Sequence, residues 1–82
     1  MDVFEIMGIQ RVTGEFEGRP YDNIRFHCLV CLQKDKKVEG LQGRITKQVS
    51  MKSDLFNNDL KIGDCVRFFY NEYKKVVFYE KM

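Results

Sequence analysis

Apolar and polar residues alternate over several short stretches of the chain, with the two-residue period of a β-strand that is buried on one face. Residues 24–32 show this pattern most clearly. The parity expected to face a core comprises Ile24, Phe26, Cys28, Val30 and Leu32. The opposite parity changes from polar at Arg25 and His27 to apolar at Leu29 and Cys31. We therefore expect the far end of this strand to be covered by another element or another subunit.

Four further stretches have strand composition and are separated by turn-forming residues. They are Val3–Val12, Leu41–Met51, Asp64–Tyr70 and Lys75–Glu80. The segment Thr13–Asn23 contains two glycines and the only proline, and it is predicted to be a loop. Two residues interrupt the alternation. Gly8 indicates a bulge in the first strand, and Lys47 lies in the apolar row of the third, where another bulge would explain it.

Between the third and fourth strands, Ser53 is placed to cap a short helix that has Asp54 in its first turn. The apolar residues expected to plug the end of a barrel from here are Leu55, Phe56 and Leu60. The last two strands are joined by a hairpin at residues 71–74 that has no glycine to define its turn type. This order of elements predicts an all-β fold, a five-stranded OB-like barrel with one short helix between strands 3 and 4.

The chain of 82 residues is predicted to be a single domain, residues 1–82. A core of this size is thin, and small folds of this kind are often stabilised by a partner subunit. The net charge is +2, but its distribution is uneven. Residues 34–52 hold six basic and two acidic side chains, whereas residues 1–33 are net acidic and residues 53–82 are balanced. A basic stretch attracts polyanions, although a solvated lysine-rich loop has the same composition.

The cysteine and histidine residues do not form a convincing reactive site. Cys28 and Cys31 would lie about 10 Å apart along one strand and point to opposite faces, which excludes a disulfide between them. His27 and Cys28 also point to opposite faces, so these residues do not converge on a zinc ion. His27 and Cys31 share a face at a separation of about 13 Å, too far for a nucleophile and its base. We therefore expect no metal, no cofactor and no enzymatic activity.

The N-terminal residues are acidic and their apolar run is too short for a signal peptide or a membrane span. We therefore expect a cytoplasmic protein that makes no membrane contact.

Binding of single-stranded nucleic acid is the positive signal that remains, because it combines a basic groove with exposed rings on which bases stack. The candidates for the groove are Arg11, Arg19, Arg25, Arg44 and Lys47. The candidate rings are Tyr21 in the first loop, Tyr73 in the last hairpin and Phe69 on the polar face of the fourth strand. Packing in the core or in a dimer is the alternative for each ring. Phe16, between two glutamates, is interpreted as a loop anchor.

The residues Gly18-Arg19-Pro20-Tyr21, between two predicted strands, resemble the gene V-type single-stranded DNA-binding proteins of filamentous phages. The resemblance is close over these four residues and otherwise rests on chain length and strand order. It implies an OB-like barrel and a cooperative homodimer that coats single-stranded DNA with little sequence preference. It also implies that Tyr21 contacts DNA, that Arg11 and Arg19 correspond to basic residues flanking the loop, and that Tyr73 corresponds to an aromatic residue at a hairpin tip.

The chain departs from that family at two places. Phe78, Tyr79 and Glu80 stand where the family carries basic residues after its late hairpin. Glu15 and Glu17 make the first loop more acidic than a DNA-coating loop would be.

The expected function is sequence-independent binding of single-stranded nucleic acid, DNA in preference, by a homodimer that coats or protects the strand in phage or mobile-element replication. Two alternatives remain. One is a protein-interaction or inhibitor module that acts through a sheet edge or the apolar patch near Leu29 and Cys31. The other is an OB module that binds RNA.

Overall fold

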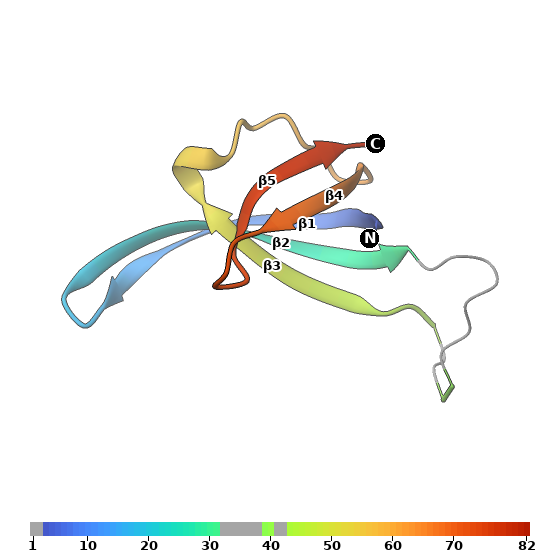
Figure 1. The fold of residues 1–82 in the computed structure, drawn as a ribbon, viewed down its shortest axis with the longest axis horizontal. Coiled ribbons are helices and arrows are strands. Elements are labelled where there is room, and N and C mark those ends of the chain that lie inside the picture. Colours follow the sequence, from blue (N-terminus) through green and yellow to red (C-terminus); the bar gives the residue numbers. More distant parts are fainter. Residues whose placement is uncertain (1–2, 32–38, 41–42) are drawn as a thin grey trace.

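A computed structural model gives the fold and describes residues 3–31, 39–40 and 43–82. The described elements are β1 (Val3–Phe16), β2 (Arg19–Cys31), β3 (Thr46–Lys52), the 3-10 turn η1 (Ser53–Leu55), β4 (Cys65–Tyr70) and β5 (Val76–Lys81). These strands close into a barrel in the order β1-β2-β3-β5-β4, and β4 pairs with β1 to complete it (Figure 1). The prediction of an all-β, five-stranded OB-like barrel with one short helix between the third and fourth strands is confirmed.

The prediction of a loop over Thr13–Asn23 is wrong, because β1 and β2 continue pairing as far as Phe16 and Arg19. Only two residues connect them. Glu17 (φ 51°) and Gly18 (φ 76°) both have positive φ, as a type I′ hairpin turn requires, and the twist of this turn matches that of the two strands. We call residues 12–23 the arm; Figure 1 shows it as the blue and cyan hairpin that extends away from the barrel.

Pro20 is compatible with this arm because of its position in the ladder. The pair that closes the turn is Phe16 and Arg19, and Pro20 pairs with Glu15 in the next rung. Rungs of an antiparallel ladder alternate between hydrogen-bonded and non-hydrogen-bonded pairs, so Pro20 needs no N–H donor towards β1. On its other side β2 pairs with β3 only from Asn23 onward, so no third strand needs that donor either.

The two predicted irregularities have different outcomes. The register between β1 and β2 shifts between Ile6 and Gly8, as the bulge prediction requires. A bulge at Lys47 is wrong, since the β2–β3 register runs evenly from Asn23 to Leu29. Lys47 keeps its inward parity and places its ammonium nitrogen 5.6 Å from the ring centre of Phe4 and 5.4 Å from that of Tyr70. The long apolar stem and two rings allow a lysine to occupy a position in the apolar row.

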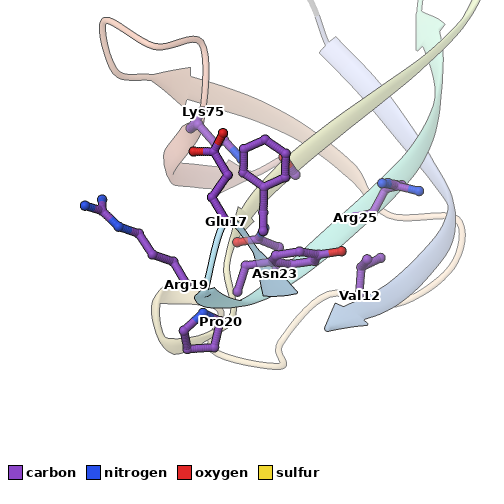
Figure 2. A pocket seen from close by; sticks show the side chains of 10 residues that line it. Val12, Glu17, Arg19, Pro20, Asn23, Arg25 and Lys75 are labelled. Carbon is purple, nitrogen blue, oxygen red and sulfur yellow. The ribbon is translucent and has the colours of Figure 1, made fainter. Parts of the chain in front are cut away.

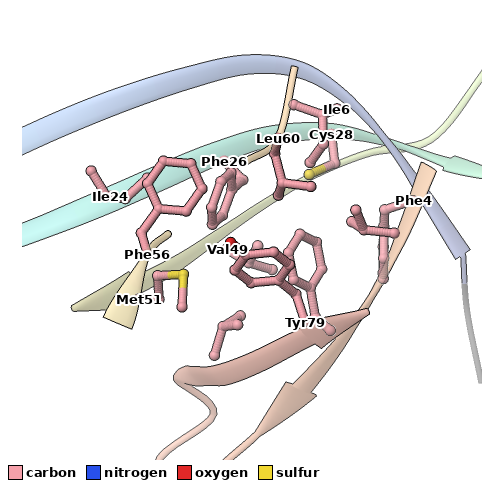
Figure 3. Packing of buried hydrophobic residues seen from close by; sticks show 13 residues of the cluster. Phe4, Ile6, Ile24, Phe26, Cys28, Val49, Met51, Phe56, Leu60 and Tyr79 are labelled. Atoms are coloured by element: carbon pink, nitrogen blue, oxygen red, sulfur yellow. The ribbon is translucent and has the colours of Figure 1, made fainter. Parts of the chain in front are cut away.

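The core is a row of aromatic rings inside the barrel (Figure 3). Phe26 is central, with its ring centre 5.5 Å from that of Phe68 and 5.4 Å from that of Phe56. Phe4 extends the row beyond Phe68, and Tyr79 extends it beyond Phe56. The rings are tilted or edge-on, which are the arrangements that aromatic quadrupoles favour.

The core predicted from alternation is confirmed for Ile24, Phe26 and Cys28, which are all buried, while Val30 is partly buried and Leu32 lies outside the described residues.

The connection from β3 to β4 plugs the barrel with two of the three predicted residues. Phe56 and Leu60 are buried, but Leu55 is 42% exposed. Ser53 does not cap the turn: Lys52 occupies the N-cap position, and no side chain makes a capping hydrogen bond there. The Ser53 hydroxyl is instead a hydrogen-bond partner of Asp22 in β2.

Within the described ranges, the structure contains no helix with the length and apolar character needed to cross a membrane.

Candidate functional site

The alternation of β1 and β2 divides the arm into two faces. Directly paired residues share a face, and the pairs Phe16–Arg19 and Gly14–Tyr21 lie on the same side. This side, the outer face, continues to Asn23 and Arg25 and then to Ser50 in β3. The opposite side, the inner face, carries Arg11, Thr13, Glu15, Pro20, Asp22 and the buried residues Ile24 and Phe26.

A cavity of about 820 Å³ opens on the outer face, between the arm and the hairpin that joins β4 to β5. Its lining residues are Val12, Phe16, Glu17, Arg19, Pro20, Tyr21, Asn23, Arg25, Ser50 and Lys75. We call this space the arm cavity. Figure 2 shows Arg19 and Arg25 on opposite sides of it with Asn23 between them, and Lys75 reaching it from the β4–β5 side. Three basic side chains and one acidic side chain, Glu17, therefore surround a space that also contains two rings.

Tyr21 lies against the backbone of β1 because residue 14 is a glycine. A Cβ atom at Gly14 would stand 2.4 Å from the Tyr21 hydroxyl oxygen and 2.6 Å from Cζ, which no real side chain permits. The ring is supported by the neighbouring strand and is still 40% exposed. A flat ring held in this way and open to solvent is suited to stacking.

Phe16 is not the loop anchor that its sequence context suggested. It is 69% exposed and lies beside the turn on the outer face. An apolar ring at the end of a two-residue hairpin has no core to reach, because the barrel lies at the other end of the arm. Phe16 therefore adds a second exposed ring to the arm cavity.

Arg11 lies on the inner face and is engaged by Asp22. Its Nε donates to Asp22 Oδ1 at 2.9 Å, and its second terminal nitrogen donates to Oδ2. These hydrogen bonds hold the pKa of Asp22 below its ordinary value, and a hydrogen bond with Ser53 lowers it further. Arg11, Asp22 and Ser53 together connect the base of the arm to η1, away from the arm cavity.

Arg44 and Lys47 also lie outside the arm cavity. The Nη1 atom of Arg44 is 3.7 Å from a Glu5 carboxylate oxygen, and its Nη2 is 4.0 Å from the Cys31 sulfur. Lys47 covers the rings at one end of the barrel. Of the seven residues predicted to bind nucleic acid, the structure thus brings Arg19, Tyr21 and Arg25 together and places Arg11, Arg44 and Lys47 elsewhere; the seventh, Tyr73, lies next to the first group.

Tyr73 lines a second cavity, of about 440 Å³, that adjoins the first. This hairpin cavity is lined by Asn23, Lys52, Leu55, Asn71, Tyr73, Lys75, Val76 and Val77. Asn23 and Lys75 line both cavities. The Tyr73 side chain is 76% exposed. Phe69 lines neither cavity, and its ring packs against the Phe78 ring, with the two ring centres 5.4 Å apart. For Phe69 the packing alternative is therefore the one that the structure supports.

Several cavity residues were absent from the sequence-based set, most importantly Lys75, Ser50 and Lys52. The parity of the third strand carried a signal for Ser50 and Lys52, since both fall on its outward row with Gln48. The signal for Lys75 was its position two residues after Tyr73, directly before β5, which places both side chains at the same hairpin.

The thiols do not add chemistry to this site. Cys28 is buried, and burial raises the pKa of its thiol to about 11, so it is protonated and unreactive at neutral pH. Cys28, Cys31 and Cys65 are all free thiols. Among the residues that the structure describes, no group of three or more His, Cys, Asp or Glu side chains is placed to hold a metal ion.

Comparison of the chain with protein-family models, with curated proteins and with solved structures gave no match.

Proposed function

We propose that this protein binds single-stranded nucleic acid, DNA in preference, through the arm cavity and the hairpin cavity. The observation that carries the proposal is the convergence of Arg19, Arg25 and Lys75 with the exposed rings of Phe16 and Tyr21 around one open space. None of these three basic side chains has a hydrogen bond or an ion pair with a described residue. Positive charge without an acidic partner favours a polyanionic ligand.

The rings make a single strand a better ligand than a duplex. In a duplex the base faces are covered by stacking, whereas a single strand offers them to aromatic side chains such as Tyr21. Stacking contributes about 1–3 kcal/mol per base and tolerates any base, because every base has a π face. The site is therefore proposed to bind with little sequence specificity and without enzymatic activity.

The preference for DNA and the biological setting rest on the sequence resemblance to gene V-type proteins. In this chain Gly18 belongs to the type I′ turn, and Arg19 and Tyr21 follow it on the outer face. We propose a cytoplasmic role in coating single-stranded DNA during phage or mobile-element replication. Competition between DNA and RNA oligomers of matched sequence tests the preference: stronger displacement by RNA assigns the site to the RNA-binding alternative.

The proposal is tested by fluorescence titration with an oligothymidine at two salt concentrations. Saturable binding that weakens with salt is expected, with a slope of about 0.7 per phosphate contact. The double variant Arg19→Gln/Arg25→Gln should lower that slope by about 1.4, because two phosphate contacts are lost. Lys61→Gln/Lys74→Gln is the matched control, since it removes two exposed charges that line neither cavity. Absence of binding at low salt, or an equal loss in both double variants, contradicts the proposal.

We propose that a homodimer forms through the solvent-exposed side of β4 and β5, around Phe78. Phe78 is 59% exposed, and its ring centre lies 5.4 Å from that of Phe69. The patch near Leu29 and Cys31, two half-buried residues, stays the second candidate for a dimer or partner surface. Sedimentation velocity of wild type and Phe78→Ser tests the surface: a dimer that becomes a monomer supports it. A wild-type monomer that captures a protein from nuclease-treated extract instead supports the protein-interaction alternative, which acts through a sheet edge or the patch near Leu29 and Cys31.

A further inference from the structure

The arm cavity and the hairpin cavity are two compartments of one open surface. They share only two lining residues, Asn23 from β2 and Lys75, which immediately precedes β5. Each compartment holds its own exposed tyrosine, Tyr21 in the first and Tyr73 in the second. Two ring-bearing spaces separated by the width of one or two side chains are suited to two neighbouring bases of one strand.

The two compartments differ in character. The hairpin cavity is bounded by the apolar side chains of Leu55, Val76 and Val77 together with Tyr73, so it offers apolar walls to a base. At about 440 Å³ it has roughly half the volume of the arm cavity. The arm cavity is lined by four charged residues, Arg19, Arg25, Lys75 and Glu17, whereas the hairpin cavity is lined by two, Lys52 and Lys75. A base in the smaller space and a nucleotide in the larger one would therefore place a linking phosphate between them.

Lys75, one of the two residues that line both cavities, is held in place by the turn that joins β4 to β5. The Asn71 side-chain oxygen accepts hydrogen bonds from the backbone N–H groups of Tyr73, at 2.9 Å, and of Lys75, at 3.0 Å. Lys74 takes a positive φ of 62° between them and donates its N–H to the Asn71 carbonyl at 3.1 Å. This network provides the turn that the absence of glycine left undefined, and it positions Tyr73 and Lys75 together.

We propose that Lys75 binds the phosphate that joins two adjacent bases, one in each cavity, so that the unit recognised here is a dinucleotide step. This inference rests on the proposed function and extends it to a subsite and a residue. Lys75 is exposed, and its ammonium group has no partner among the described residues, so it is available to a phosphate. Asn23, the other shared residue, offers an amide that can hydrogen-bond a base edge or a sugar.

The test uses a thymidine dinucleotide whose only charge is its internal phosphate, together with an analogue in which that linkage is an uncharged methylphosphonate. Binding to the ¹⁵N-labelled protein is followed by amide chemical shifts. Wild type should bind the charged ligand about three- to fivefold more tightly, as an exposed ion pair allows, and the amides of both Tyr21 and Tyr73 should shift. Lys75→Gln should lose most of this preference, whereas the matched control Lys74→Gln should keep it.

An unchanged preference in Lys75→Gln, or shifts confined to one of the two tyrosines, overturns the inference. The long oligothymidine separates this failure from failure of the proposed function. If the oligomer binds with the expected salt dependence while the dinucleotide shows no coupling to Lys75, only the assignment of Lys75 is wrong. If neither ligand binds at low salt, the proposed function fails as well.

Discussion

On the inner face of the β1–β2 hairpin, Arg11 is paired with Asp22, whereas on the outer face Arg19 and Arg25 have no acidic partner among the described residues. The three arginines look equivalent in the sequence. Their roles differ because strand residues alternate between faces, and the register across the Glu17–Gly18 turn decides which side each one joins. One face thus fixes the arm to the barrel, and the other presents charge and rings to a ligand.

Removal of the Tyr21 ring should cause the largest loss on the outer face. Tyr21→Ala is expected to weaken oligothymidine binding by about 1–3 kcal/mol, or roughly five- to 150-fold, because one stacking platform is lost. Titration at low salt measures this, and Tyr21→Phe is the control because it keeps the ring. An affinity of Tyr21→Ala equal to that of wild type would remove this residue from the site.

Gly14→Ala should reproduce part of that loss without removing any binding group. The new Cβ would meet the Tyr21 hydroxyl and Cζ at 2.4 and 2.6 Å, so the ring must swing away from β1. Stability should change little, since alanine suits a strand better than glycine by about 0.5–1 kcal/mol and this offsets the displaced contact. The effect of Gly14→Ala on affinity is measured twice, once in the wild-type protein and once in the Tyr21→Ala variant.

The two substitutions should not be additive. Gly14→Ala is expected to have no further effect once Tyr21 has been replaced by alanine, because its effect passes through the ring. Equal losses in both backgrounds would show that Gly14 acts on the strand itself rather than on Tyr21.

The barrel was accessible from the sequence because its strands bury one face and expose the other. Alternation identified Ile24, Phe26 and Cys28 as core, and the order of strands then indicated the topology. The arm was not accessible in this way. Neither of its faces is deeply buried beyond Ile24, so no apolar row marks it as strand, and its glycines and proline have the composition of a loop. The sequence did not reveal the register of the arm, so it could not show that Arg11 and Arg19 lie on opposite faces of the hairpin.

On the inner face, Asp22→Asn should loosen the arm while changing affinity less than Tyr21→Ala does. The variant removes the charge that holds Arg11 and weakens the connection to Ser53. Exposed ion pairs contribute little to global stability, so the effect should be local. Hydrogen exchange of arm amides should accelerate relative to those of the barrel, with Asp54→Asn as the control for an exposed acid within η1. Equal acceleration in both variants would contradict the role of Asp22.

Lowering the pH should weaken the contact between Asp22 and Arg11 without a mutation, because it protonates the Asp22 carboxylate. The pKa of Asp22 is lowered by its hydrogen bond with Arg11, and that of Asp64 is lowered first by the backbone N–H of Lys61 and then by Lys81. A depressed pKa contributes stability above the unfolded value of 3.8 that is lost as the pH falls through the folded value. The free energy of unfolding in urea should therefore fall below about pH 4. Asp22→Asn and Asp64→Asn should each flatten that decline, and an unchanged pH profile in both would contradict these assignments.

The smallest expected change is a gain, and it compares two glutamates of the arm directly. Glu17 lines the arm cavity with a φ of 51°, whereas Glu15 pairs with Pro20 on the inner face. Glu17→Asn removes a charge that repels phosphate and places Asn-Gly, the favoured type I′ pair, in the turn. Affinity for oligothymidine should rise about twofold at low salt, and the free energy of unfolding should rise by less than about 1 kcal/mol. Glu17→Gln separates the charge from the turn, and Glu15→Gln is the matched control. If Glu15→Gln tightens binding as much as Glu17→Asn does, the gain reflects net charge alone, and the two faces of the arm are not electrostatically distinct.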